Sequence, residues 1–231
     1  MKYIKIAAGM AEGFDFGKVK EKMKEAMDAG CDYCHSDAAD MYEVKKLQLI
    51  GGHNIMYYVR QITDKPIECH FYTQECDLLF IEKIAYVGCN MLILPAERFI
   101  GTQLVSIIDW CREKNVKIGL TIGSYAPLSL VEEAVYDIDR IHVETQGAGD
   151  CLRRSSLDLI KRTRKLIDEK NPSCELSVGG KICPENMEEV IACNPDVVVV
   201  SSAIFKEPDG IAAGVQKCRT AVDEAVKKFN L

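Results

Sequence analysis

Short apolar segments recur along the chain and alternate with longer amphipathic segments. The apolar segments are Tyr3–Ala8, Asp32–Asp37, Ile67–Phe71, Met91–Leu94, Lys117–Ile122, Arg140–Glu144, Leu176–Gly179 and Val197–Ser201. Their length and their near-continuous apolar character are typical of parallel strands with both faces buried. The amphipathic stretches between them predict helices, the clearest being Gly17–Ala29, Arg154–Lys170 and Ile211–Phe229.

The junctions that lead from a helix into the next strand resemble one another. Gly30, Gly88 and Asn194 stand at equivalent places in them, and glycine or asparagine there suits a left-handed helix cap. Eight strand–helix units of this kind predict one α/β domain, residues 1–231, in which a parallel sheet closes into a (β/α)8 barrel. An open doubly wound sheet is the alternative, although it rarely has eight such regular units.

Composition and charge narrow the classes of function. The net charge is −6 and the basic residues are spread along the predicted helices, which argues against nucleic-acid binding. The chain begins directly with a strand, and no apolar run approaches the roughly 18 residues of a membrane span, so we expect a cytoplasmic protein with no membrane partner. We expect the eleven cysteines to be reduced and buried. Cys31-Asp-Tyr-Cys34-His35 has the spacing of a haem attachment site, but we read it as accidental because it lies in a predicted strand.

Polar side chains stand at the ends of two neighbouring predicted strands, where such barrels carry their functional groups. His35 and Asp37 end the second strand and His70 ends the third. Two imidazoles and a carboxylate form a metal site that leaves coordination positions open for substrate. We therefore expect a divalent ion, Zn, Mn or Fe, at these three residues. The alternative is that each histidine is a hydrogen-bonded core residue.

Glycine and serine follow the last two predicted strands. Glycine lets backbone N–H groups approach a phosphate, and a hydroxyl at a helix start adds a donor; phosphate sites after strands 7 and 8 recur in these barrels. The alternative is that these residues only form tight turns. The candidate phosphate-binding residues are Gly179, Gly180, Ser201 and Ser202, with Gly147 and Gly149 after the sixth strand.

Several motifs, in order along nearly the whole chain, resemble those of the ribulose-phosphate 3-epimerase family. His35-Ser-Asp-Ala-Ala-Asp40 resembles the family's His-Val-Asp-x-Met-Asp, and Glu68-Cys-His70-Phe resembles its Asp-Val-His-Leu. Further matches are Glu97, Gly119, Pro127-Leu128, Gly179-Gly180 and Ser202-Ala-Ile-Phe205. The resemblance implies a TIM barrel of the ribulose-phosphate-binding type.

The resemblance also implies an activity, that of an isomerase acting on a ketose phosphate. In that family two histidines and two aspartates bind a divalent metal, and the two aspartates move the C3 proton through a metal-bound enediolate. This sequence supplies His35, Asp37 and His70, but Val178 stands directly before the paired glycines, where the family has its second catalytic aspartate. A small sugar phosphate is the implied substrate, and we expect a homo-oligomer.

A second acid is available on the sixth predicted strand. A gapless count from Pro127-Leu128 places Glu144 where the family has a methionine, and strand alternation directs His142 and Glu144 into the barrel. We expect Glu144 to be a relocated acid or metal ligand and to act with Asp37; the alternative is a surface glutamate.

Other departures from the family lie nearby. Ala8, Ala39 and Tyr72 replace the family's serine and two methionines, which suggests a substrate other than ribulose 5-phosphate. A lyase or an aldose–ketose isomerase that uses the same enediolate remains open, since one base can suffice. A non-catalytic sugar-phosphate-binding homologue also remains open.

Overall fold

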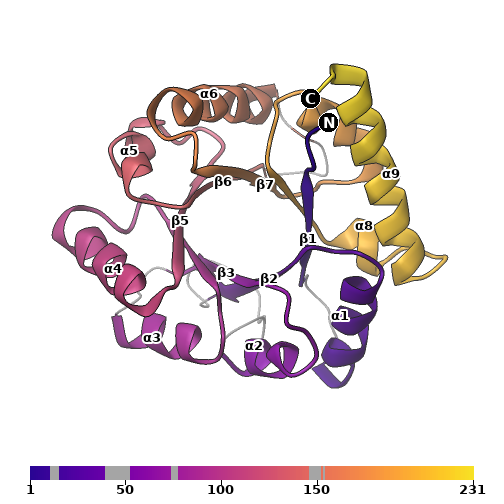
Figure 1. The fold of residues 1–231 in the computed structure, drawn as a ribbon, viewed down its shortest axis with the longest axis horizontal. Helices are drawn as coiled ribbons and strands as arrows, with labels where there is room; N and C mark the ends of the chain where they lie inside the picture. The colour runs from indigo at the N-terminus through magenta and orange to yellow at the C-terminus, as the bar shows by residue number, and fades with distance from the viewer. Residues whose placement is uncertain (11–15, 40–52, 74–77, 146–151, 153) are drawn as a thin grey trace.

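Parallel strands close into a barrel in the computed structural model of the chain, which describes residues 1–10, 16–39, 53–73, 78–145, 152 and 154–231. The strands are β1 (Lys5–Gly9), β2 (Tyr33–Ala39), β3 (Ile67–Tyr72), β4 (Met91–Pro95), β5 (Lys117–Gly123), β6 (Arg140–Glu144), β7 (Glu175–Gly179) and β8 (Val197–Val200). Each strand pairs with the next, and β8 pairs with β1, so that the sheet has no open edge (Figure 1).

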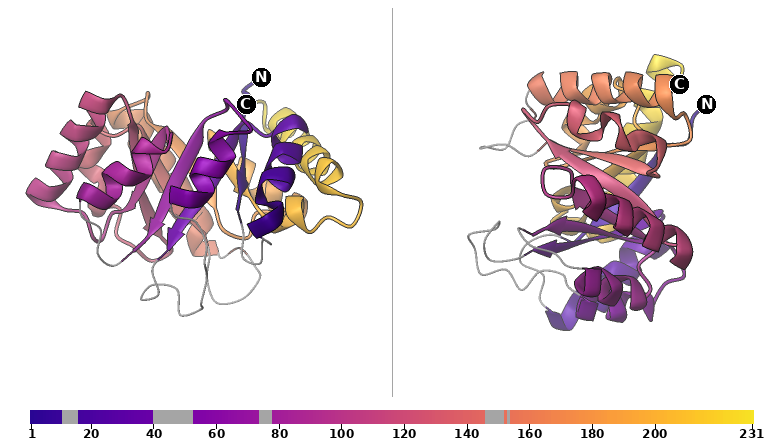
Figure 2. Two further views of the ribbon diagram at one scale, coloured as in Figure 1. Left: turned by 90° about the horizontal axis from the view of Figure 1, so that it is seen from below. Right: turned by 90° about the vertical axis from the view of Figure 1, so that its left-hand side faces the viewer.

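Helices surround the barrel on its outside, as both Figure 1 and the side views of Figure 2 show. In chain order the helical segments are η1 (Phe16–Lys18), α1 (Val19–Asp28), α2 (His53–Arg60), α3 (Leu78–Tyr86), α4 (Gly101–Lys114), α5 (Ser129–Glu132), η2 (Ala134–Tyr136), α6 (Arg154–Lys170), α7 (Pro184–Ile191), α8 (Ser202–Phe205) and α9 (Ile211–Phe229). The two termini lie close together (Figure 2), and the Lys2 N–H donates to the Leu231 carbonyl at 2.9 Å.

The predicted (β/α)8 barrel is therefore confirmed, and the pairing of β1 with β8 excludes the open doubly wound sheet. Strand bounds differ from the expected ones by at most two residues; β6 has the expected bounds, Arg140–Glu144, whereas β1 begins at Lys5 rather than Tyr3. The helices α6 and α9 have the predicted bounds, Arg154–Lys170 and Ile211–Phe229.

Two further expectations can be compared with the described part of the chain. The described cysteines are free thiols, and all of them except the half-buried Cys183 are buried. Within the described residues, no helix combines the length and the apolar character needed to cross a membrane.

Alternate residues of each strand face opposite sides of the barrel wall. On β6, Ile141 and Val143 belong to the apolar core between the strands and the helices. His142 points inward, and its ring centroid lies 4.9 Å from that of His70 on β3. Strand alternation had predicted these directions from the sequence.

The junctions between helices and strands have the expected left-handed caps. Gly30, Gly88 and Asn194 adopt φ angles of 118°, 97° and 57°. Only glycine adopts the first two angles without strain, while asparagine tolerates the third. Each cap turns the chain at once into the next strand.

A side chain just before each even-numbered strand accepts a hydrogen bond from the backbone at the start of the preceding odd-numbered strand. Asp32, before β2, accepts from Ile6 N at 2.8 Å, and Asn90, before β4, accepts from Ile67 N at 2.9 Å. Asp139 and Asp196 do the same for Ile118 N and Leu176 N, at 2.9 and 2.8 Å. We call these four side chains the base clamps, because they lie at the end of the barrel where the strands begin.

Charged side chains fill the barrel interior above the base clamps. Arg140 is fully buried, its Nη2 lies 2.5 Å from Glu175 Oε2, and its Nη1 pairs with the equally buried Glu68. Lys5 Nζ lies 2.5 Å from the other oxygen of Glu175. Each buried charge thus has an opposite charge beside it, as burial requires.

Arg140→Leu should destabilise the protein strongly, because it leaves the buried Glu68 carboxylate without its guanidinium partner. Removing one member of a buried pair costs about 3–5 kcal/mol, which urea unfolding would measure. Arg112→Leu is the matched control, since Arg112 pairs with Asp137 at 2.6 Å on the exposed surface. That change should cost less than about 1 kcal/mol, and equal costs for the two variants would contradict this account of Arg140.

Candidate metal centre and active site

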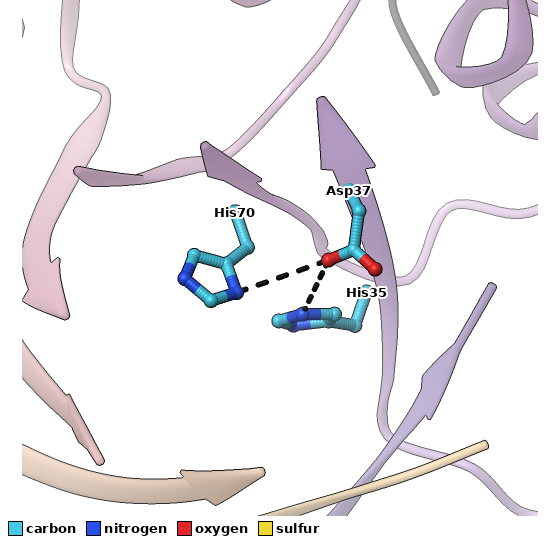
Figure 3. Close-up of side chains that lie close together, drawn as sticks. All are labelled: His35, Asp37 and His70. Carbon is cyan, nitrogen blue, oxygen red and sulfur yellow. Dashed lines mark ion pairs between the residues drawn. The ribbon is translucent and has the colours of Figure 1, made fainter. Parts of the chain in front are cut away.

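Three ligand-type side chains converge where β2 and β3 end. His35 and Asp37 are two residues apart on β2, so both face the interior, and Asp37 is the register partner of His70 on β3. Asp37 Oδ1 lies 3.2 Å from His35 Nε2 and 3.8 Å from His70 Nδ1 (Figure 3). One ligand atom from each residue lies within 4.8 Å of the others. The structure therefore brings together His35, Asp37 and His70.

Buried atoms without hydrogen-bond partners mark this place as one that fits a cation. Asp37 Oδ1, both ring nitrogens of His70 and Nε2 of His142 are buried and make no hydrogen bond in the described part of the protein. Leaving such an atom unsatisfied costs about 1–3 kcal/mol. Imidazole nitrogen and carboxylate oxygen are ligands of Zn, Mn and Fe, so the donor set suits a divalent metal ion.

A carboxylate behind His35 fixes the orientation of its ring. His35 Nδ1 lies 2.7 Å from Glu68 Oε1. Burial would raise the pKa of Glu68, but Arg140 and His35 outweigh burial and lower it to about 2. An ionised carboxylate can only accept a hydrogen bond, so His35 donates from Nδ1 and its Nε2 faces Asp37. A carboxylate in this position commonly supports a metal-binding histidine.

The two histidines of this group respond differently to their surroundings. Burial would lower the pKa of His35, but the neighbouring carboxylates of Asp37 and Glu68 raise it to about 10. The site thus favours positive charge beside Asp37, which a proton or a metal ion can supply. Burial, followed by the nearby His142 and His35, holds the pKa of His70 well below its usual value. His70 is therefore neutral at pH 7, and a neutral imidazole can bind a metal.

A second group of ligand-type side chains shares His70 with the first. His70, His142 and Glu144 also offer ligand atoms within 4.8 Å of one another. His142 Nδ1 lies 2.7 Å from Ser177 Oγ, and Tyr72 donates to Glu144 at 2.7 Å. Burial, followed by Glu144, raises the pKa of Tyr72 well above its usual value, so the phenol remains a donor. Glu144 is part of the barrel mouth rather than of the outer surface.

His142 was not among the predicted site residues, although strand alternation had predicted that its side chain points into the barrel. One signal in the sequence could have identified it. His142-Val-Glu144 at the end of β6 repeats the pattern of His35-Ser-Asp37 at the end of β2, an imidazole and an acid two residues apart.

The structure corrects the position assigned to the missing acid on β7. Val178 is fully buried in the core between the strands and the helices, whereas its neighbours Ser177 and Gly179 face His142 inside the barrel. A side chain at 178 therefore points away from the mouth and cannot replace a catalytic acid there. The inward position at this level of β7 is Gly179.

The candidate phosphate-binding residues lie at the ends of the adjacent strands β7 and β8. Gly180 has φ of 90°, and the Thr145 hydroxyl donates to the carbonyl of Gly179 at 2.7 Å and to that of Gly180. Ser201 Oγ is buried and has no partner among the described residues, and Ser202 begins α8. Gly147, Gly149 and Asp40 lie outside the residues that the structure describes.

A pocket of about 340 Å³ opens beside His70, on the β3 to β6 side of the mouth. This volume lies in the range of small-molecule sites. Its lining includes His70, Tyr72, Glu97, Arg98, Thr121 and Glu144.

Known proteins share this fold and much of the sequence pattern. The chain is 26% identical over 215 residues to Ribulose-phosphate 3-epimerase of Aquifex aeolicus, covering 92% of this chain and 94% of that protein. It is 28% identical over 228 residues to Ribulose-phosphate 3-epimerase of Methanocaldococcus jannaschii, covering 97% and 94%. These relatives match along nearly their whole length.

Solved structures with lower identity show the same barrel. The 3-keto-L-gulonate-6-phosphate decarboxylase of Vibrio cholerae superposes with a TM-score of 0.74 at 14% identity, covering 99% of this chain and 98% of that one. The 3-hexulose-6-phosphate synthase of Salmonella typhimurium gives 0.71 at 15% identity, covering 96% and 100%. The sequence pattern of the Ribulose-phosphate 3 epimerase family matches residues 5–205. The chain therefore belongs to the ribulose-phosphate 3-epimerase family.

Proposed function

We propose that the chain is a metal-dependent epimerase that inverts C3 of a ketose phosphate through an enediolate. The observation that carries this proposal is that two acids, Asp37 and Glu144, flank His70 in the barrel mouth, one in each group of ligand-type side chains. Inversion needs an acid–base group on each face of the substrate, and family membership supports the reaction class. Ala39 and Tyr72 support a substrate other than ribulose 5-phosphate, whereas Ala8 belongs to the core between the strands and the helices and does not contribute to the mouth.

Each residue of the mouth has a role in this proposal. His35, Asp37 and His70 hold a divalent ion, Zn, Mn or Fe, which when bound would stabilise negative charge on the substrate oxygens. Asp37 removes the C3 proton from one face, and Glu144 delivers a proton to the other. Tyr72 positions Glu144 through its 2.7 Å hydrogen bond.

The substrate phosphate, in this proposal, binds at the ends of β7 and β8. Backbone N–H groups of Gly179, Gly180 and Ser202 surround it, and the Ser201 hydroxyl donates to it. The unpartnered Ser201 Oγ supports this assignment, because phosphate oxygens are strong acceptors.

A lyase or an aldose–ketose isomerase that uses the same enediolate is the second candidate. Gly179 favours it, because β7 presents no acid to the mouth at this level, and one base suffices for such reactions.

Exposed aromatic side chains on neighbouring outer helices support a further proposal, that copies of the chain associate. Tyr57 and Tyr58 on α2 and Tyr86 on α3 are exposed, and tyrosine is enriched at protein interfaces. Light scattering of the purified protein should give a mass above that of one 25.8 kDa chain; a monomer at all concentrations would contradict the proposal.

Glu144→Gln should lower kcat by about 100-fold or more, the usual effect of losing a general acid or base. The change keeps the side-chain volume, so the fold should remain intact. Activity and incorporation of solvent deuterium at C3 would be measured across ketose phosphates. Glu113→Gln, on the exposed face of α4, is the matched control and should leave both unchanged.

Full activity in Glu144→Gln would mean that the second proton comes from elsewhere. Wild-type protein that exchanges a proton but never inverts C3 would favour the second candidate. If no ketose phosphate exchanges a proton in the metal-loaded wild-type protein, the chain is a non-catalytic binding homologue and the proposal fails.

Ser201→Ala should raise KM for a ketose phosphate by roughly 10-fold, since a hydrogen bond to a charged group contributes about 1.5–3 kcal/mol. KM for the unphosphorylated sugar should change little. Ser106→Ala on the exposed part of α4, where the hydroxyl donates to the Thr102 carbonyl of its own helix, is the control. Equal changes for both sugars would show that Ser201 does not contact phosphate.

A further inference from the structure

The ring of His142 occupies the space that a side chain on β7 would need. A Cβ atom at Gly179 would lie 2.8 Å from His142 Cε1 and 2.9 Å from Nε2, distances that no real side chain tolerates. The glycine and the histidine are thus complementary across the paired strands β6 and β7, in which the register partner of Gly179 is Glu144 and that of His142 is Ser177. The inner face of β7 at this level is filled by an imidazole from β6.

His142 is oriented as a metal ligand would be. Its Nδ1 lies 2.7 Å from Ser177 Oγ, while its Nε2 is buried, has no hydrogen-bond partner among the described residues and lies 3.8 Å from Glu144 Oε2. A purely structural histidine would leave that nitrogen unsatisfied at a cost of about 1–3 kcal/mol. A hydrogen bond that fixes one ring nitrogen and leaves the other for a metal is common at metal centres.

Three imidazoles from three strands surround the same region of the mouth. The ring centroid of His142 lies 4.9 Å from that of His70 and 5.7 Å from that of His35. The centroids of His35 and His70 are 5.6 Å apart. His142 offers a ligand atom within 4.8 Å of one from His70, and His70 is also a member of the group that contains His35 and Asp37.

We propose that His142 is the fourth ligand of the metal centre, together with His35, Asp37 and His70. This inference rests on the proposed function and specifies its metal site. The donor set has three imidazoles and one carboxylate. Imidazole-rich sites suit Zn and Fe, whereas carboxylate-rich sites suit Mn and Mg. The site therefore selects Zn or Fe over Mn, and it leaves Glu144 with Tyr72 as an acid–base group.

Metal binding tests this assignment without any assay of activity. Metal-free protein would be titrated with Zn²⁺ against a chromophoric chelator, and X-ray absorption of the Zn-loaded protein would count the imidazole ligands. The wild type should show three imidazoles. His142→Gln should show two and bind Zn²⁺ more than about 100-fold more weakly, because losing only an outer-shell partner already costs about 10- to 100-fold.

The fourth histidine of the chain provides the matched control. His53 is the first residue of α2, a helix that lies outside the barrel (Figure 1), and His53→Gln should change neither the affinity nor the imidazole count. Thermal unfolding of the metal-free proteins would show whether each variant is folded.

A double variant tests whether the ligand position has been exchanged between strands. His142→Ala empties the space beside Gly179, and Gly179→Asp then provides a carboxylate from β7 in that space. The backbone at Gly179 does not have a positive φ, so it accepts a side chain. The double variant should bind Zn²⁺ at least about 10-fold more tightly than His142→Ala, with two imidazoles.

The outcomes separate this inference from the proposed function. A wild-type centre with two imidazoles, or a His142→Gln protein with unchanged affinity, would overturn the role of His142 and leave the proposed function standing. Wild-type protein that binds neither Zn²⁺ nor Fe²⁺ would overturn both. If His142→Gln fails to fold, the imidazole count of the wild type still decides.

Discussion

A line of alternating charges runs through the barrel from the strand starts to the mouth. Arg140 is its centre, and each carboxylate in it separates two cationic or basic groups. Buried charges are stable only beside opposite charges, so each side chain fixes the position of the next. The line ends at Asp37, which faces the ring of His35 that Glu68 holds in place. In order, its members are Lys5, Glu175, Arg140, Glu68, His35 and Asp37.

Most of the fold and much of the site could be predicted from the sequence. Eight apolar runs predict the strands, and repeated junction residues such as Gly30 and Asn194 predict where each helix ends. Both signals are local in the sequence, so the barrel could be predicted from them. The convergence of His35, Asp37 and His70 followed from their places at strand ends. The line of charges could not be predicted, since Arg140, Glu68 and Glu175 are distant in sequence and meet only when the barrel closes.

The errors arose where a strand has both faces buried. Leu176-Ser-Val-Gly179 alternates large apolar residues with serine and glycine, but the family motif placed the acid directly before the paired glycines, and an error of one residue exchanges the two faces. Val178 was therefore assigned to the mouth, although Gly179 faces it. His142 was missed although His142-Val-Glu144 repeats the pattern of His35-Ser-Asp37. The space that Gly179 leaves for its ring depends on the pairing of β6 with β7, which a single sequence does not show.

The base clamps join the strands in pairs, β1 with β2, β3 with β4, β5 with β6 and β7 with β8. The barrel is thus built from four similar modules, each fastened at the end opposite the chemistry. Residues at the mouth can then change without disturbing the pairing of the strands, because the hydrogen bonds of the base clamps do not involve them. Exchange of a ligand between β7 and β6 is the kind of drift that such an architecture tolerates. A barrel whose stabilising hydrogen bonds and functional residues lie at opposite ends can acquire new substrates by single substitutions while the strands keep their register.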